Sequence, residues 1–210
     1  MKSIFPSMLA LLLARATPSS AQYYTNQSAP FYLTTAPCAN TSTASEFLYS
    51  CHSGAAIEQL CLVGDRNGTI DARYGQYYLN FSSDFLVNGF EVGNLVWNMP
   101  YTINETTFNE SESLNFYFNP TSNVADLLFE PSFDGAVNLG FDADNKMFIY
   151  NYVDDSVSPP NASGGYKAYY QWYSCVTYFL GYTYTALAWV TYGKPVNPSC
   201  HAVNVTRIFV

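Results

Sequence analysis

A stretch of 26 residues without a charged side chain, Ala168 to Gly193, constrains the fold of this chain more than any other feature. Its length would suit a transmembrane helix, which needs about 20 apolar residues. The stretch, however, is rich in Tyr and Thr, which favour strands. From Tyr182 to Val190 the residue types also alternate with a period of two, as in a strand. We therefore predict two long central strands hinged at Gly181, and no membrane span.

The rest of the chain also predicts strands. Short apolar runs are bounded by Gly, Pro, Asn and Asp, which is typical of strands and turns. Asn88-Gly89 and Gly93-Asn94 are predicted hairpin turns, and the polar stretch 102–113 is predicted to be a solvated loop. The predicted fold class is all-β, as a single antiparallel β-sandwich or closed β-barrel, with a trefoil-like barrel as runner-up.

The first 21 residues have the pattern of a secretory signal peptide. Lys2 is followed by an apolar stretch that is too short to span a bilayer, and Ser19-Ser20-Ala21 supplies the small residues before a cleavage site. Removal of residues 1–21 would leave 189 residues (210 − 21), which suits one domain over residues 22–210. The expected location is therefore extracellular or in the cell wall.

The charge balance excludes two classes of partner. The net charge is −8, and it becomes −10 when Lys2 and Arg15 leave with the signal peptide. So acidic a chain lacks the basic surface that binds nucleic acid or an anionic membrane. Cell-wall polysaccharide or another extracellular protein remains as the expected partner.

Asn-x-Ser/Thr sequons are more frequent than chance. The 18 Asn residues and the Ser/Thr fraction of 36 in 210 predict about three sequons, and eight are present. Two of them, Asn80 and Asn204, lie in strand-like runs, where an ordinary strand Asn explains them equally well. The sites expected to be glycosylated are Asn26, Asn40, Asn67, Asn104, Asn109 and Asn161.

The five cysteines fit an oxidising compartment. They allow two bridges in fifteen arrangements, and Cys51–Cys61 with Cys175–Cys200 is favoured because each pair closes a local loop. Cys38 is then the unpaired thiol. The sequence contains no C-x-x-C and no paired-histidine spacing, so no metal site is predicted.

Catalytic motifs are weak. The sequence has no G-x-S-x-G, and its only histidines, His52 and His201, each follow a cysteine. Asp154-Asp155 is the only adjacent acidic pair, and it is better explained as a cap on the turn that follows. Glu58, flanked by apolar residues, is the acid most expected to be partly buried, with a structural hydrogen bond favoured over a general-acid role.

Asp142-Ala143-Asp144-Asn145 has the oxygen-ligand spacing that opens a calcium loop, but the glycine and glutamate of an EF-hand are missing. A hairpin turn explains this segment. We therefore predict no catalytic residue, no metal and no cofactor.

Aromatic residues are the remaining lead. Tyr and Trp rings can pack against the apolar faces of sugars while their polar ends form hydrogen bonds. Adjacent residues on a strand point to opposite faces, so each tyrosine pair is expected to send one ring toward solvent. The candidate ligand platform is Tyr77, Tyr78, Tyr169, Tyr170 and Trp172.

Two segments carry a resemblance to a known family. Cys51 to Glu58 (CHSGAAIE) and Tyr170 to Cys200, which ends in GKPVNPSC, resemble an uncharacterised family of small fungal secreted proteins. More distantly, the HSGAA motif and the Asn-Pro-x-Cys ending are similar to the fungal cell-wall protein PhiA. The resemblance implies a fungal, extracellular or wall-associated protein and supplies no catalytic residues. Cys38 lies outside the shared pattern.

Three functions follow in order of preference. The first is a non-enzymatic secreted or cell-wall glycoprotein with a structural or interaction role. The second is a carbohydrate-binding module with an exposed Tyr/Trp platform. The third is a glycoside hydrolase that uses Glu58 or the Asp154-Asp155 pair.

Overall fold

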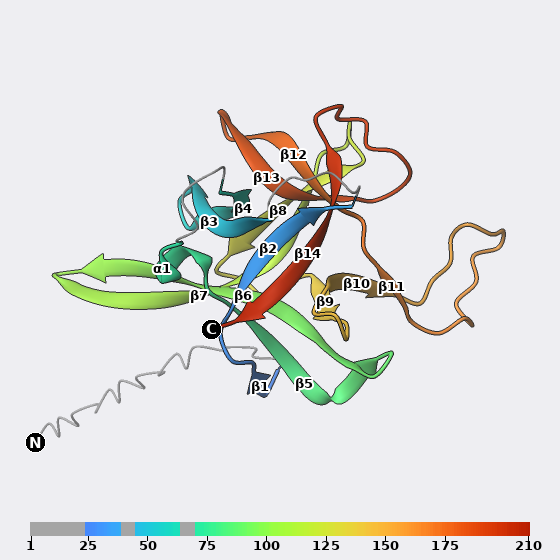
Figure 1. Cartoon of the computed structure of the whole chain (residues 1–210), viewed down its shortest axis with the longest axis horizontal. Helices are drawn as coiled ribbons and strands as arrows, with labels where there is room; N and C mark the ends of the chain where they lie inside the picture. Colours follow the sequence, from blue (N-terminus) through green and yellow to red (C-terminus); the bar gives the residue numbers. More distant parts are fainter. Residues whose placement is uncertain (1–23, 39–44, 64–69) are drawn as a thin grey trace, which may run out of the picture.

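The computed structural model describes residues 24–38, 45–63 and 70–210, and these form fourteen strands and one short helix (Figure 1). The predicted signal peptide and the sequons at Asn40 and Asn67 lie outside the described residues. The elements are β1 (Asn26–Gln27), β2 (Phe31–Pro37), β3 (Glu46–Gly54), β4 (Ile57–Leu62), α1 (Ala72–Gly75), β5 (Tyr77–Val87), β6 (Phe90–Ile103), β7 (Thr106–Phe118), β8 (Val124–Glu130), β9 (Asn138–Phe141), β10 (Met147–Asn151), β11 (Lys167–Tyr169), β12 (Trp172–Phe179), β13 (Tyr182–Val190) and β14 (His201–Phe209).

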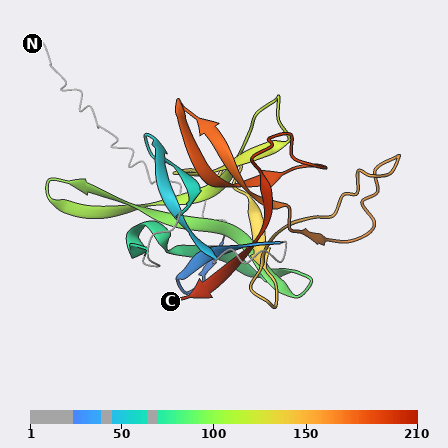
Figure 2. The ribbon, with the colours of Figure 1, turned by 45° about the horizontal axis from the view of Figure 1, so that its top comes forward.

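The strands form one large antiparallel sheet. Its order is β1-β5-β2-β14-β12-β13-β4-β8-β7-β6-β9-β10-β11, and β3 pairs with both β2 and β4. Because β5 pairs with β6 as well as with β2, strands distant in this order meet and the sheet wraps around a shared core (Figure 2). The predicted all-β antiparallel fold is confirmed.

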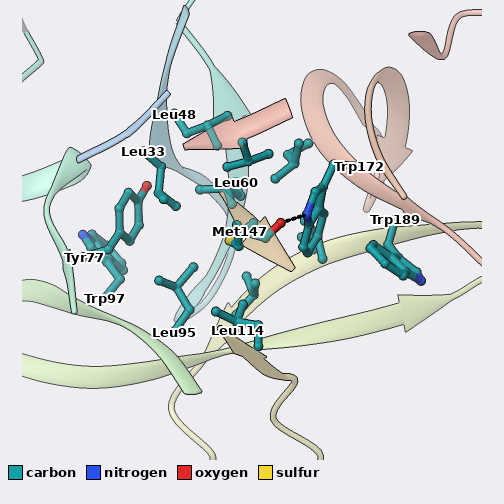
Figure 3. Close-up of a cluster of buried hydrophobic side chains, with 14 of the residues drawn as sticks. Leu33, Leu48, Leu60, Tyr77, Leu95, Trp97, Leu114, Met147, Trp172 and Trp189 are labelled. Atoms are coloured by element: carbon teal, nitrogen blue, oxygen red, sulfur yellow. Dashed lines mark hydrogen bonds between the residues drawn. The ribbon is translucent and has the colours of Figure 1, made fainter. Parts of the chain in front are cut away.

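The core lies where the inward faces of these strands meet. Figure 3 shows the leucines of β2, β3, β4, β6 and β7 packed between three tryptophans and Tyr77. The indole of Trp172 donates a hydrogen bond of 2.7 Å to the carbonyl of Met147, and its ring meets that of Trp189 edge-on with centroids 4.7 Å apart. The polar end of Trp172 is therefore satisfied although the side chain is fully buried.

The uncharged stretch forms the two predicted central strands. β12 and β13 pair along their whole length, from Trp172 opposite Trp189 to Phe179 opposite Tyr182. Leu180 and Gly181 make the two-residue turn, both at positive φ (46° and 95°). Across the described part of the chain, no helix has the length and apolar character that crossing a membrane requires.

Two local predictions around β6 are wrong. Asn88-Gly89 is the predicted turn, with both residues at positive φ, but Gly93-Asn94 lies inside the continuous strand β6. A Cβ at Gly93 would collide with the Asn80 carbonyl, so this glycine permits close approach to β5 instead of a turn. Residues 102–113 are mostly exposed, but most of them belong to β6 and β7. These two strands pair with each other here, so their backbone N–H and C=O groups are hydrogen-bonded although the segment lies away from the core.

Candidate functional site

The most exposed part of the central strands is the end of the β12–β13 hairpin, which stands out from one end of the molecule in Figures 1 and 2. Residues 176–185 pair only with each other among the described strands, since β14 pairs with β12 no further than Ser174 and β4 pairs with β13 at Ala186. Exposed side chains crowd this end of the hairpin. We call the following set the tyrosine tip: Val176, Tyr178, Leu180, Tyr182, Thr183 and Thr185.

The aromatic rings of the tyrosine tip face solvent. Tyr178 and Tyr182 are 72% and 68% exposed, and Leu180 between them is 62% exposed. Val176 and Tyr178 lie opposite Thr185 and Thr183, so these four side chains share one face of the hairpin. Tyr182 lies opposite Phe179 and so belongs to the other face. Solitary exposed apolar residues are common on proteins, but several of them gathered at one end of an element favour a binding role.

The opposite face fixes the hairpin to the body. Phe179 is buried and meets the ring of Tyr117 edge-on, with centroids 5.2 Å apart. The buried Thr177 hydroxyl accepts a hydrogen bond of 3.0 Å from the Gln59 amide, and the Tyr184 hydroxyl donates one of 3.3 Å to the carbonyl of His52. The exposed rings are therefore carried by an element that is anchored from beneath.

The outer edge of β12 is covered by side chains of the segment before β14. The Val176 amide donates to the Ser199 hydroxyl (2.9 Å), and the Asn197 side-chain amide donates to the Val176 carbonyl (2.8 Å). The Cys175–Cys200 disulfide ties the same two segments together. Because both backbone groups of Val176 are engaged, this point of the edge cannot receive an added strand.

The first part of the connecting loop 191–200 is held by the side chain of Asn123. Its amide nitrogen donates to the carbonyls of Tyr192 (2.6 Å) and Lys194 (2.9 Å), while its oxygen accepts from the Val196 amide (2.9 Å). These hydrogen bonds give an exposed loop a defined backbone course.

The second candidate is a pair of buried carboxyl groups. Glu58 on β4 and Glu112 on β7 are 5% and 0% exposed. Glu58 lies opposite His52 on β3 and Phe129 on β8, while Glu112 lies opposite Trp97 on β6. Within the described residues no N–H or O–H donor reaches Glu58 Oε2 or either oxygen of Glu112. When one of the two carboxyl groups is protonated, its O–H can donate a hydrogen bond to the other carboxylate.

The surroundings of the pair favour that proton. Burial raises the pKa of Glu112 to about 9, reinforced by hydrogen bonding to Glu58 and by the negative charges of Glu58, Glu110 and Glu130. Within the described residues the imidazole of His52 approaches the pair, with its Nδ1 3.7 Å from Glu58 Oε1, but this side chain is largely exposed. The expectation that Glu58 is partly buried is confirmed, and its burial is nearly complete.

This arrangement suits proton sharing better than hydrolysis. Two glycosidase carboxyls flank the scissile bond at about 5–9 Å, with the substrate between them. Glu58 and Glu112 are instead covered by the core, so a sugar chain cannot enter between them.

The sequence did not point to Glu112. It lies in the polar segment Asn-Glu-Ser-Glu-Ser before Leu114, where we expected a loop. The usable signal was the period of two, since Glu112, Leu114 and Phe116 occupy alternate positions of β7 and so point to one face.

The predicted aromatic platform does not form as a set. Tyr77 and Trp172 are fully buried in the core (Figure 3) because their strand faces point inward. Tyr78 and Tyr169 are half-buried. Tyr170 is exposed, and its hydroxyl donates 2.9 Å to Asp142 Oδ2. The prediction that Tyr77 and Trp172 present rings to a ligand is therefore wrong.

The other acidic candidates have structural partners. Asp154 Oδ1 accepts hydrogen bonds from the backbone and hydroxyl of Ser156, and these lower the pKa of Asp154. Lys167 Nζ lies 3.5 Å from its other oxygen, and Asp155 is exposed beside it. Asp142 Oδ1 accepts from the amides of Asp144 and Lys146, as a hairpin-turn residue does.

The two predicted disulfides, Cys51–Cys61 and Cys175–Cys200, are confirmed, and Cys38 is an exposed free thiol. Each bridge joins neighbouring segments of the sheet, and each has a histidine next to one of its cysteines in the sequence. His52 and His201 are both exposed, on β3 and β14.

The predicted sequons spread unevenly over the surface. Asn104 and Asn109 are exposed on the β6–β7 hairpin, Asn161 is exposed on the loop before β11, and Asn26 is half-buried on β1. No sequon occurs between Asn161 and Asn204, the segment that contains the tyrosine tip. Glycosylation itself stays a prediction.

The chain belongs to the family described as a domain of unknown function (DUF7907), which matches residues 28–209 and so spans nearly all of the described sheet. Searches of curated proteins and of solved structures find no match.

Proposed function

We propose that this member of the DUF7907 family is a secreted, non-enzymatic glycoprotein of the fungal cell wall or extracellular space that acts by binding. The observation that carries the proposal is the tyrosine tip, which exposes the rings of Tyr178 and Tyr182 at the end of an anchored, uncharged hairpin. Exposed aromatic surface on a fixed scaffold favours association, because few side chains must be immobilised on binding.

Three further features support this proposal. Two disulfides suit an oxidising compartment, and the residues before the family match have the pattern of a signal peptide. The sequon excess suits a glycoprotein. The burial of Glu58 and Glu112, and the structural hydrogen bonds of Asp154, favour binding over glycoside hydrolysis. The distant similarity to PhiA favours the wall as the location.

The test is expression of the full chain in a eukaryotic secretory host. We expect the medium to contain a protein that begins at Gln22 and that loses mass on treatment with an N-glycosidase. Incubation with chitin, β-glucan and cellulose should release no reducing ends. A chain that stays intracellular with residues 1–21 attached would contradict secretion, and release of sugar would contradict a non-enzymatic role.

A further inference from the structure

We infer that the tyrosine tip is a binding site for a neutral, hydroxyl-rich polysaccharide. This inference rests on the proposed binding function and names its ligand class and its residues. It replaces the platform expected from the sequence with a different set of rings.

The exposed side chains of the tip have the chemistry that binds a sugar. The outer face of the hairpin carries the flat ring of Tyr178 beside the hydroxyls of Thr183 and Thr185. Tyr182, opposite Phe179, exposes a second ring at the turn on the other face. A sugar ring has an apolar face and a rim of hydroxyl groups. Aromatic rings cover the first, and tyrosine and threonine hydroxyls can donate to or accept from the second.

The hairpin that carries the tip is uncharged. No charged side chain occurs from Ala168 to Gly193, although the whole chain carries a net charge of −8. A surface without cations offers nothing to an anionic polymer or an anionic membrane, and one without anions offers nothing to a basic protein. The ligand that complements an uncharged, hydroxyl-bearing surface is itself uncharged and hydroxyl-bearing.

The predicted glycans lie on a different projecting hairpin. The β6–β7 hairpin also projects (Figure 1) and exposes Ile103 and Phe108, but it carries two sequons, at Asn104 and Asn109. Glycans there would cover its apolar residues. The β12–β13 hairpin, in contrast, carries no sequon of its own.

Part of the hairpin edge is closed to backbone pairing. Ser199 and Asn197 occupy the backbone groups of Val176, so strand addition by a second chain is blocked at this point of β12. A sugar polymer attaches through side chains and does not need a free strand edge. The bracing by Gln59 and Tyr117 keeps those side chains in a fixed arrangement.

The experiment is a depletion assay on the secreted, enzymatically deglycosylated chain. The probes are insoluble chitin, β-1,3-glucan and cellulose, with an anionic polygalacturonate as the contrasting polymer. We expect saturable depletion by at least one neutral polymer, a change of less than twofold between 50 and 500 mM NaCl, and no depletion by polygalacturonate.

Variants then place the site. Tyr178→Ala and Tyr182→Ala should each weaken depletion about tenfold or more, because centrally placed aromatic residues dominate such surfaces. Tyr152→Ala is the matched control, since Tyr152 is also an exposed tyrosine but lies outside the tip. All three side chains lie at the surface, so the melting temperature should stay within a few degrees of the parent value.

Each outcome decides one point. Depletion that both tip variants retain would overturn the inference and leave the proposed binding function standing on another surface. No depletion by any neutral polymer would overturn the inference, and a protein ligand would then have to supply the binding function. Self-association of the parent chain that Tyr178→Ala abolishes would assign the tip to a second copy and would also overturn it. Released reducing ends would instead contradict the proposed function.

Discussion

The buried carboxyl pair predicts an unusual dependence of stability on pH. Glu112 binds its proton more tightly in the folded chain than in the unfolded chain, where a glutamate has a pKa of about 4.3. Between that value and the raised pKa of about 9, the folded state holds a proton that the unfolded state has lost. Stability from this group is therefore fully present below about pH 4 and is lost as the pH rises.

The size of the effect follows from the same linkage. Each pH unit in this window changes the free energy of unfolding by about 1.4 kcal/mol per proton. A rise from about pH 4.5 to about pH 7 therefore costs about 3 kcal/mol through the pair. Several carboxyl groups with ordinary partners oppose this trend, as Asp71 and Asp154 do, because hydrogen bonds lower their pKa values.

The variant that isolates the pair is Glu112→Gln. Its amide keeps the shape of the protonated acid, does not titrate, and can still donate to Glu58. We expect the free energy of unfolding of Glu112→Gln to fall by about 3 kcal/mol less than that of the parent chain between pH 4.5 and pH 7. The measurement is urea unfolding followed by tryptophan fluorescence, and Trp97 opposite Glu112 is a suitable reporter.

Glu110→Gln is the control, because Glu110 lies two residues away on β7 and is exposed. It removes one negative charge from the neighbourhood and should change the pH slope far less. Parallel stability curves for the parent and Glu112→Gln over this range would refute the buried-proton argument, whatever their absolute stabilities.

Three further predictions concern the tip and the elements that hold it. Leu180 adopts φ 46°, where a side chain other than Gly or Asn costs about 1 kcal/mol, so Leu180→Asn should raise the free energy of urea unfolding by about that amount; a fall would contradict turn strain. Asn123→Ala removes three hydrogen bonds to loop 191–200 and should cost about 1–3 kcal/mol and open that loop to limited proteolysis; an equally protected loop would show that Asn123 does not hold it. Replacing Cys175 and Cys200 by Ser opens a loop with a sequence separation of 25 and should cost about 3.5 kcal/mol, against about 2.7 kcal/mol for the other bridge with its separation of 10; urea midpoints in the reverse order would refute the loop-entropy account.

Local patterns in the sequence predicted the elements whose partners lie close along the chain. The β12–β13 hairpin follows from alternation over Tyr182 to Val190, and the Asn88-Gly89 turn follows from the positive φ that its residues tolerate. The disulfides followed from short spacing for the same reason. These features need no knowledge of distant strands.

Features that depend on distant pairing were missed. Glu112 is buried because β7 places it toward Glu58, a residue 54 positions earlier whose strand reaches β7 only through β8. Tyr77 and Trp172 were named in the candidate ligand platform, yet both lie on inward faces that only the full strand order defines. A tyrosine pair shows that one ring points inward, but not which one.

The acid pair and the tyrosine tip should respond differently to pH, and this separates stability from binding. The tip contains no acidic, basic or imidazole side chain. The titratable groups near its base in the described chain are His52, whose carbonyl accepts from Tyr184, and Asp126, whose pKa burial raises to about 6 although a hydrogen bond from Thr177 opposes the shift. Asp126 has largely lost its proton above pH 7, whereas Glu112 still holds one. From pH 7 to 8.5, polysaccharide depletion by the folded protein should therefore stay constant within twofold while the free energy of unfolding continues to fall. A loss of binding that runs parallel to the loss of stability would mean that the tip and the buried pair are coupled through β4, the strand that carries both Glu58 and Gln59.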